Sequence, residues 1–191
     1  SKTTNGGATW IEQATTPVYN TQIGHIDMYD ANTGYIGTDD NLWKTTNGGT
    51  NWNKLNTLPA GLFWTKVQTF SPTTLYLGGN QKIYKSFDGG QTWSSASIPS
   101  LLPSIANMDW WDLNNGMVTG TDGYTARTTD GGLTWTERDP GSSTIPGVSM
   151  SSRDTIYATC DRNVYGAIFR LVDSNPAISF NIKAGIEGFW N

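Results

Sequence analysis

The chain has 191 residues, of which 36% are hydrophobic and 15% charged, so it is long enough to bury a core and is not expected to be disordered. Its net charge of −4 offers no basic surface for phosphate contacts, so a nucleic-acid partner is not expected. Cys160 is the only cysteine, which excludes an internal disulfide and a zinc site built from several cysteines. No apolar run approaches the roughly 18 residues of a membrane span, so none is expected.

An octapeptide, called the box below, recurs four times along the chain. Each copy begins with Thr or Ser, has Asn or Asp at its third position followed by two glycines, and ends with Trp. The Asn or Asp can accept backbone hydrogen bonds across a tight turn, the glycines supply positive φ, and the Trp is expected to pack in the core. The predicted structural residues of the boxes are Asn5, Trp10, Asn47, Trp52, Asp88, Trp93, Asp130 and Trp135.

The boxes divide the chain into units of similar length, because their tryptophans are 42, 41 and 42 residues apart. Turn-forming segments such as Asp30–Gly34 and Asp112–Gly116 divide each unit into four short strands. Four strands in about 40 to 45 residues is the size of a β-propeller blade, so the predicted fold is an all-β propeller of four-stranded antiparallel blades. The expected parts are the end of a blade at 1–22, blades at 23–61, 62–103 and 104–146, a degenerate blade at 147–183, and the inner strand of a further blade at 184–191.

Partial blades at both ends favour a piece of a larger ring, because a five-bladed ring closed by the two end pieces would lack its second strand. That closed ring and an association of two chains remain the alternatives. The expected partners therefore include the remaining blades of a parent chain or a second copy.

The octapeptides resemble the Asp-box pattern Ser/Thr-x-Asp-x-Gly-x-Thr-Trp, which residues 86–93 and 128–135 match in full. Asp-box propellers include sialidases, sortilin-type receptors, xyloglucanases and the photosystem II stability/assembly factor family. The Asn/Asp-Gly-Gly style with a preceding Lys or Arg looks most like the last group and related secreted bacterial propellers. The box marks a fold and not a chemistry, since families that share it have unrelated functions.

Few residues are candidates for catalysis, and no catalytic residue is predicted. A glycosidase needs two carboxyl groups across a sugar site, and Asp27, Asp109 and Glu187 are the acids nearest the expected inner strands. Asp27 and Asp109 occupy equivalent positions of two blades, which favours a repeated structural role. His25 is the only histidine, so a Ser-His-Asp relay has little support. The acidic pair Asp39 and Asp40 does not fit a calcium loop, and no metal or cofactor is expected.

Aromatic residues outside the boxes are better candidates for binding. Trp64, Trp110, Trp111 and Trp190 lie in or beside expected inner strands and, with Asp109 and Glu187, form the predicted binding set. The alternative for these tryptophans is packing between blades. The basic residue before each box, for example Arg127, is expected to be a solvated strand position because Lys takes its place elsewhere.

The Pro-bearing connections at 15–22, 56–61, 97–103 and 139–146 should emerge on one face, and they carry almost no charge. This pattern favours a noncatalytic binding or scaffolding module that presents a loop face to a protein or carbohydrate partner. The composition and the resemblance together indicate a secreted or cell-surface bacterial protein. The alternatives are a segment of a glycan-active enzyme and an assembly factor that captures a partner protein.

Overall fold

The computed structural model describes residues 1–13, 23–38, 41–58, 66–79, 81–99, 102, 104–120, 123–138, 144–162, 165–172 and 181–182. These residues form sixteen β-strands, and none of them belongs to a helix. A search of the described chain accordingly finds no helix that is long and apolar enough to cross a membrane.

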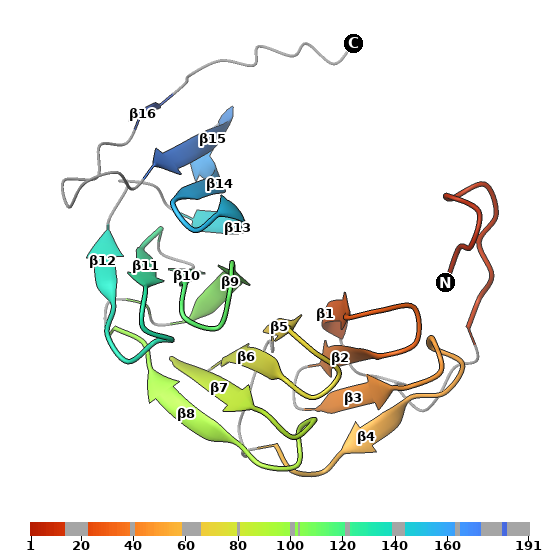
Figure 1. Ribbon diagram of the computed structural model, residues 1–191. Helices are drawn as coiled ribbons and strands as arrows, with labels where there is room; N and C mark the ends of the chain where they lie inside the picture. The colour runs from red at the N-terminus through yellow and green to blue at the C-terminus, as the bar shows by residue number, and fades with distance from the viewer. Residues whose placement is uncertain are drawn as a thin grey trace. The chain divides into compact units, whose positions relative to one another are not determined.

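The strands form four sheets of four strands each, numbered here in chain order (Figure 1). Sheet 1 contains β1 (Ile23–Met28), β2 (Gly34–Thr38), β3 (Leu42–Thr45) and β4 (Asn53–Leu55). Sheet 2 contains β5 (Lys66–Thr69), β6 (Leu75–Gly79), β7 (Lys82–Ser86) and β8 (Ser94–Ser97). Sheet 3 contains β9 (Ile105–Trp110), β10 (Gly116–Gly120), β11 (Thr125–Thr128) and β12 (Thr136–Arg138). Sheet 4 contains β13 (Thr144–Ser152), β14 (Thr155–Arg162), β15 (Tyr165–Val172) and β16 (Asn181–Ile182).

In each sheet every strand lies beside the next one along the chain, and the pairings resolved in sheets 1, 3 and 4 are antiparallel. The prediction of an all-β chain of four-stranded antiparallel units is confirmed. Sheet 4 begins at Thr144, ahead of the expected start at residue 147, and its first pairing shifts register between Thr144 and Gly147.

The second strands of sheets 1, 2 and 3 are buried along their whole length. All five residues of β2, β6 and β10 are buried, and these strands consist of glycines, apolar residues and at most one Thr, with no alternation of apolar and polar residues. That composition is typical of strands covered on both faces. The fourth strands β4 and β8 are short and mostly exposed, which protects the sheet edges from pairing with other chains.

The described chain divides into two compact units, residues 1–77 with 85–94 (unit 1) and residues 78–84 with 95–191 (unit 2), so that sheet 2 contributes to both. In unit 1, β5 packs against β1 and β2. Tyr35 of β2 is fully buried there, and its hydroxyl donates a hydrogen bond to the carbonyl oxygen of Pro72 at 3.0 Å. A buried aromatic ring with a satisfied hydroxyl thus holds two neighbouring sheets together.

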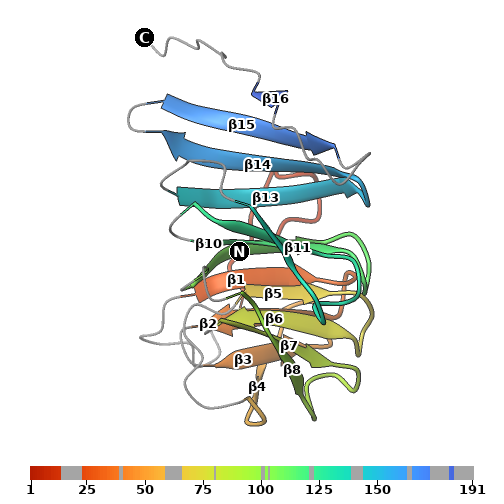
Figure 2. The same ribbon diagram turned by 90° about the vertical axis from the view of Figure 1, so that its left-hand side faces the viewer.

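In unit 2, β13 packs against β9 and β10. Met117 of β10 forms a buried cluster with Met150 and Ile156 of sheet 4. The Thr119 hydroxyl donates to the carbonyl oxygen of Ile145 at 2.8 Å, which satisfies both buried groups. Figure 2 shows β13, β14 and β15 side by side as long strands of sheet 4.

All four boxes form the same hydrogen-bonded turn. The hydroxyl of the first residue accepts from the backbone N–H of the second glycine at 2.7–2.9 Å, and it donates to the Asn or Asp side chain at 2.8–3.0 Å. That side chain accepts from the backbone N–H four residues further on, at 2.9 Å in each box. Both glycines have positive φ in every copy, from 68° to 92°. A side chain at either glycine would strain the turn, which explains the invariant pair.

The first glycine of a box also ties the turn to the rest of its own sheet. The N–H groups of Gly48, Gly89 and Gly131 donate to the carbonyl oxygens of Asn32, Thr73 and Asn114 at 2.7–2.9 Å. These carbonyls lie in the turns between the first two strands of sheets 1, 2 and 3. The box and the first turn therefore meet at the same end of each sheet, which is called its turn end below.

The two boxes that contain Asp predict a pH dependence of stability that the two boxes with Asn lack. Hydrogen bonds from the Thr134 hydroxyl and its backbone N–H lower the pKa of Asp130 to about 2, and those from Thr92 hold the pKa of Asp88 well below its usual range. Both values lie below the roughly 3.9 of an unfolded chain, so these carboxylates stabilise the fold above that pH. Their contribution is lost as the pH falls toward 2.

We therefore expect the variant Asp88→Asn/Asp130→Asn to show a shallower fall of Tm than the parent between pH 5 and pH 2. Asn is tolerated structurally, because Asn47 forms the same turn. The reciprocal change Asn47→Asp should steepen the fall. Thermal melts followed by circular dichroism across this pH range test both changes, and parallel profiles for all three proteins would contradict the assignment.

Candidate functional site

Exposed apolar side chains gather at the turn ends of the sheets. In unit 1 they are Tyr29, Phe70 and Phe87, which form the unit 1 turn surface; Tyr29 is 46% exposed, Phe87 58%, and Phe70 is half-buried. In unit 2 they are Trp111, Leu113 and Leu133, which form the unit 2 turn surface; Trp111 is 51% exposed and Leu133 80%. Tyr29, Phe70 and Trp111 each follow the first strand of a sheet directly.

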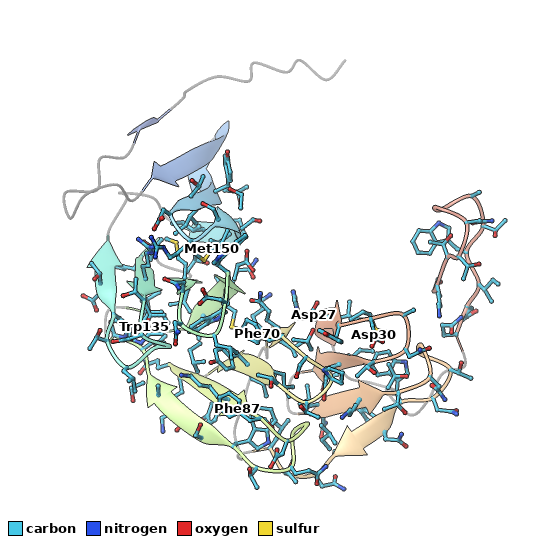
Figure 3. All side chains as sticks on the ribbon, viewed as in Figure 1. Asp27, Asp30, Phe70, Phe87, Trp135 and Met150 are labelled. Carbon is cyan, nitrogen blue, oxygen red and sulfur yellow. The ribbon has the colours of Figure 1, made fainter. Side chains whose placement is uncertain are left out.

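A buried ring supports the unit 1 turn surface from below. Phe70 and Tyr76 meet edge to face with centroids 4.8 Å apart, and Tyr76 meets Phe87 edge to face at 6.5 Å (Figure 3). The ammonium group of Lys85 lies 5.1 Å from the centroid of the Tyr76 ring. Because Tyr76 is buried, it holds two partly exposed rings in place. Aromatic side chains fixed in this way lose little conformational entropy when they bind a ligand.

Of the two adjacent tryptophans predicted for binding, only Trp111 presents free surface. Trp110 is 3% exposed, and its ring meets the box residue Trp135 edge to face with centroids 6.0 Å apart. It also fills the space above Gly116, where a Cβ atom would lie 2.2 Å from the indole. Trp111 stands in the turn beyond β9. That turn is closed by Asp112, whose carboxylate accepts from the backbone N–H groups of Asn114 and Asn115 at 2.8 and 2.7 Å.

The two described candidate carboxylates join neighbouring sheets. Asp27 accepts from both the backbone N–H and the hydroxyl of Thr69, at 2.6 and 2.7 Å. Asp109 accepts from the backbone N–H of Met150 at 2.6 Å and from that of Trp110 at 3.0 Å. Their equivalent positions in the repeat therefore carry equivalent contacts. A carboxylate whose oxygens accept backbone N–H groups is held in one orientation, which suits a structural role better than proton transfer.

Several predicted residues lie outside the described part of the chain. These are Trp64, Glu187 and Trp190 of the predicted binding set, the acidic pair Asp39 and Asp40, the expected inner strand at 184–191, and most of the Pro-bearing connections. Among the described residues, no group of three or more His, Cys, Asp or Glu side chains is arranged to hold a metal ion. Burial, and secondarily the charge of Lys66, lowers the pKa of His25, so its ring is neutral at pH 7.

The expectation that Arg127 is solvated is wrong. Arg127 is 8% exposed, and its Nη2 donates to the carbonyl oxygen of Arg153 at 2.9 Å and lies 3.5 Å from the Asp154 carboxylate. Lys44, which precedes the second box, likewise reaches the Pro72 carbonyl oxygen, at 3.4 Å. The basic residue before a box therefore extends to the first turn of the next sheet. Lys and Arg can both occupy this position, because both side chains are long enough to place a hydrogen-bond donor there.

The expectation that the box tryptophans pack in the core also needs correction. Trp10 is 64% exposed, and Trp52, Trp93 and Trp135 are half-buried. Each indole lies over the second glycine of its own box, 3.1–3.9 Å from where a Cβ atom would stand. The indole covers the turn because glycine leaves room for it, so these tryptophans are part of the turn and not of the interior.

Sequence reasoning missed Tyr29, Phe70, Phe87, Leu113 and Leu133. A signal was present, because an aromatic residue follows the first strand of sheets 1, 2 and 3 at the same repeat position. Phe87 and Leu133 occupy variable box positions, where an apolar residue has no role in the turn.

No protein-family model and no curated protein matches the chain. Solved structures do match its backbone. YCF48 bound to D1 peptide superimposes with a TM-score of 0.64 at 20% identity, covering 91% of this chain and 57% of that one. YCF48 from Cyanidioschyzon merolae gives 0.58 at 16% identity, covering 78% and 55%. The GH74 enzyme of Niastella koreensis gives 0.62 at 17% identity, covering 83% and 30%.

The chain has the β-propeller fold. The resemblance to the photosystem II assembly factor group is confirmed at the level of fold, since YCF48 is among the similar structures. The propeller strands of this chain span just over half the length of the YCF48 chains and 30% of the GH74 chain. The similar propellers include both a peptide-bound protein and glycoside hydrolases, so this fold accommodates binding and catalysis alike.

Proposed function

We propose that the chain is a noncatalytic propeller module of a secreted or cell-surface bacterial protein, and that its turn surfaces bind a protein or carbohydrate partner. The proposal rests on a contrast between the exposed aromatic side chains at the turn ends and the candidate carboxylates, which already have hydrogen-bond partners. Tyr29, Phe87 and Trp111 are exposed, whereas the carboxylates of Asp27 and Asp109 are occupied by backbone N–H groups. Rigid exposed aromatics are the residues that dominate protein interfaces and stack on sugar rings.

Two observations support a polypeptide partner over a glycan. A propeller of similar backbone is solved with a peptide bound, at 20% identity. The unit 1 turn surface also presents three aromatic side chains, a residue type that is enriched at protein interfaces. Capture of a partner protein, as by an assembly factor, is the form of binding that we favour.

The second candidate is a glycan-active enzyme, because GH74 propellers are also similar in backbone. The discriminating measurement is the release of reducing sugar from a panel of polysaccharides that includes xyloglucan, incubated with the purified chain. Sustained hydrolysis would contradict the noncatalytic assignment. The absence of hydrolysis, with retarded migration in gels that contain xyloglucan, would instead indicate carbohydrate binding.

For a protein partner, we expect Phe87→Ser or Trp111→Ser to weaken capture at least about tenfold, because exposed aromatic anchors commonly contribute about 2 kcal/mol or more. The wild type and the variants are immobilised, and the protein retained from a native extract is quantified by mass spectrometry. Gln91→Ser is the matched control, since Gln91 is exposed in the same box as Phe87 but carries no ring. Equal capture by all four proteins would exclude the turn surfaces as the binding site.

A further inference from the structure

One face of sheet 1 is exposed where the equivalent face of the other sheets is covered. Ile26 and Met28 flank Asp27 in β1, and they are 54% and 38% exposed. Met108 and Trp110 flank the equivalent Asp109 in β9, and they are 7% and 3% exposed. Val67 of β5 and Met150 of β13 hold the corresponding positions in the remaining sheets, and they are 1% and 7% exposed. Residues two apart in a strand share one face, so Ile26 and Met28 form one apolar strip, called the β1 face.

The other sheets show what covers this face. Met108 packs on Gly78 of β6, where a Cβ atom would lie 2.9 Å from its sulfur atom. Met150 packs on Met117 of β10. In both cases the cover comes from the second strand of the preceding sheet. The kind of surface that fits the β1 face is therefore the second strand of another sheet of this repeat.

Sheet 4 carries a surface of this kind that is itself uncovered. Tyr157 of β14 pairs with Ser149 of β13, as Tyr35 pairs with Asp27 and Met117 pairs with Asp109. Tyr35 and Met117 are 0% and 2% exposed, whereas Tyr157 is 40% exposed. The face of β14 that carries Tyr157 is called the β14 face below. It corresponds to the faces of β6 and β10 that cover Met108 and Met150 in the other sheets.

We propose that the β1 face of one molecule binds the β14 face of a second copy of this chain. The contact would repeat the sheet-to-sheet packing already present within each unit, with Tyr157 of one copy against Ile26 and Met28 of the other. Backbone register supports the match: Arg170 pairs with Tyr157, as Lys44 pairs with Tyr35. The basic residue that crosses to the neighbouring sheet in unit 1 thus has its counterpart beside Tyr157.

Residues 1–13 contact sheet 1 at its turn end, and we expect the second copy to displace them. Lys2 pairs with Ile11, and its Nζ donates to the Gly48 carbonyl oxygen at 3.2 Å. Trp10 and Ile11 are 64% and 62% exposed, so few apolar contacts hold this segment against the sheet. Displacing it costs little, because the hydrogen bond from Lys2 to the Gly48 carbonyl oxygen is a single, partly buried contact with a small net free energy.

The two faces differ, so the contact is head-to-tail, and this makes the proposal testable by complementation. Sedimentation velocity of the wild type should show a mass that rises with concentration. Ile26→Arg blocks one face and Tyr157→Arg blocks the other, and each change should weaken self-association at least about 30-fold, because the contact buries an unpaired charge. An equimolar mixture of the two variants should form 1:1 dimers, since one intact face of each kind remains.

Circular dichroism should show unchanged folding, because both replaced side chains are already partly exposed. Gln91→Arg adds the same charge at an exposed box position outside both faces and should associate as the wild type does. A wild type that stays monomeric at all concentrations would overturn the proposal. So would a mixture of the two Arg variants that stays monomeric, or self-association that either variant retains. None of these outcomes affects partner capture by the turn surfaces, which is measured separately.

Discussion

Replacing Trp110 with alanine should lower the free energy of unfolding of unit 2 by about 3–5 kcal/mol, the range typical of a buried Trp. The indole is 3% exposed, packs edge to face on Trp135, and covers Gly116. Its removal leaves a cavity that Gly116 cannot fill, and it withdraws support from the fourth box, which contains Trp135. Urea denaturation followed by far-UV circular dichroism measures the change, with the slope of the transition checked for two-state behaviour.

The matched control is the adjacent Trp111→Ala. Trp111 is half exposed in the turn beyond β9, so the same chemical change should cost less than about 1 kcal/mol. The order should reverse for partner binding. Trp111→Ala should weaken binding more than Trp110→Ala does, because Trp111 is the proposed contact. Comparable stability losses for the two changes would contradict the positions assigned to these side chains.

Trp110 and Trp111 show how much of this structure can be predicted from the sequence. Two adjacent tryptophans at the end of a strand cannot both lie on one face of the sheet, so one can be covered while the other is exposed. The sequence does not show which, because that depends on Gly116 directly opposite Trp110 in the register. A glycine pairing with a tryptophan across two strands is visible only once the register is known.

The fold was predictable because its signals are local and repeated. The box requires a hydroxyl, an Asn or Asp, and two glycines for reasons that lie within eight residues, and the repeat then sets the number of strands. Arg127 was misread because its partners, Arg153 and Asp154, lie in the next sheet. A residue whose partners belong to another repeat looks like a solvated residue when only its own strand is considered.

The sequence predicts only part of the candidate site, because some of its contacts join different repeats. The sequence places both Asp109 and Trp111 near the end of a first strand, and the structure separates them: Trp111 is exposed, whereas Asp109 is hydrogen-bonded to the next sheet. The exposed partners of Trp111 in other sheets, Tyr29 and Phe70, are found only by comparing repeat positions instead of searching for tryptophan.

Asp109→Asn should destabilise the protein by about 2 kcal/mol, and the equivalent Asp27→Asn by less than about 1 kcal/mol. At Asp109 both carboxylate oxygens accept backbone N–H groups, Oδ1 from Trp110 and Oδ2 from Met150. The amide of Asn would turn one acceptor into a donor that faces a partly buried backbone N–H group, which is unfavourable.

At Asp27 a single oxygen, Oδ2, accepts both the Thr69 N–H and the Thr69 hydroxyl. The carbonyl oxygen of Asn can take that place, so only the contribution of the negative charge is lost. Urea denaturation of the two variants beside the wild type tests the difference, and Asp109→Ala separates loss of the acceptors from the unfavourable amide. If Asp27→Asn were the more damaging change, the hydrogen bonds that join the sheets would not be those that the structure places at these two carboxylates.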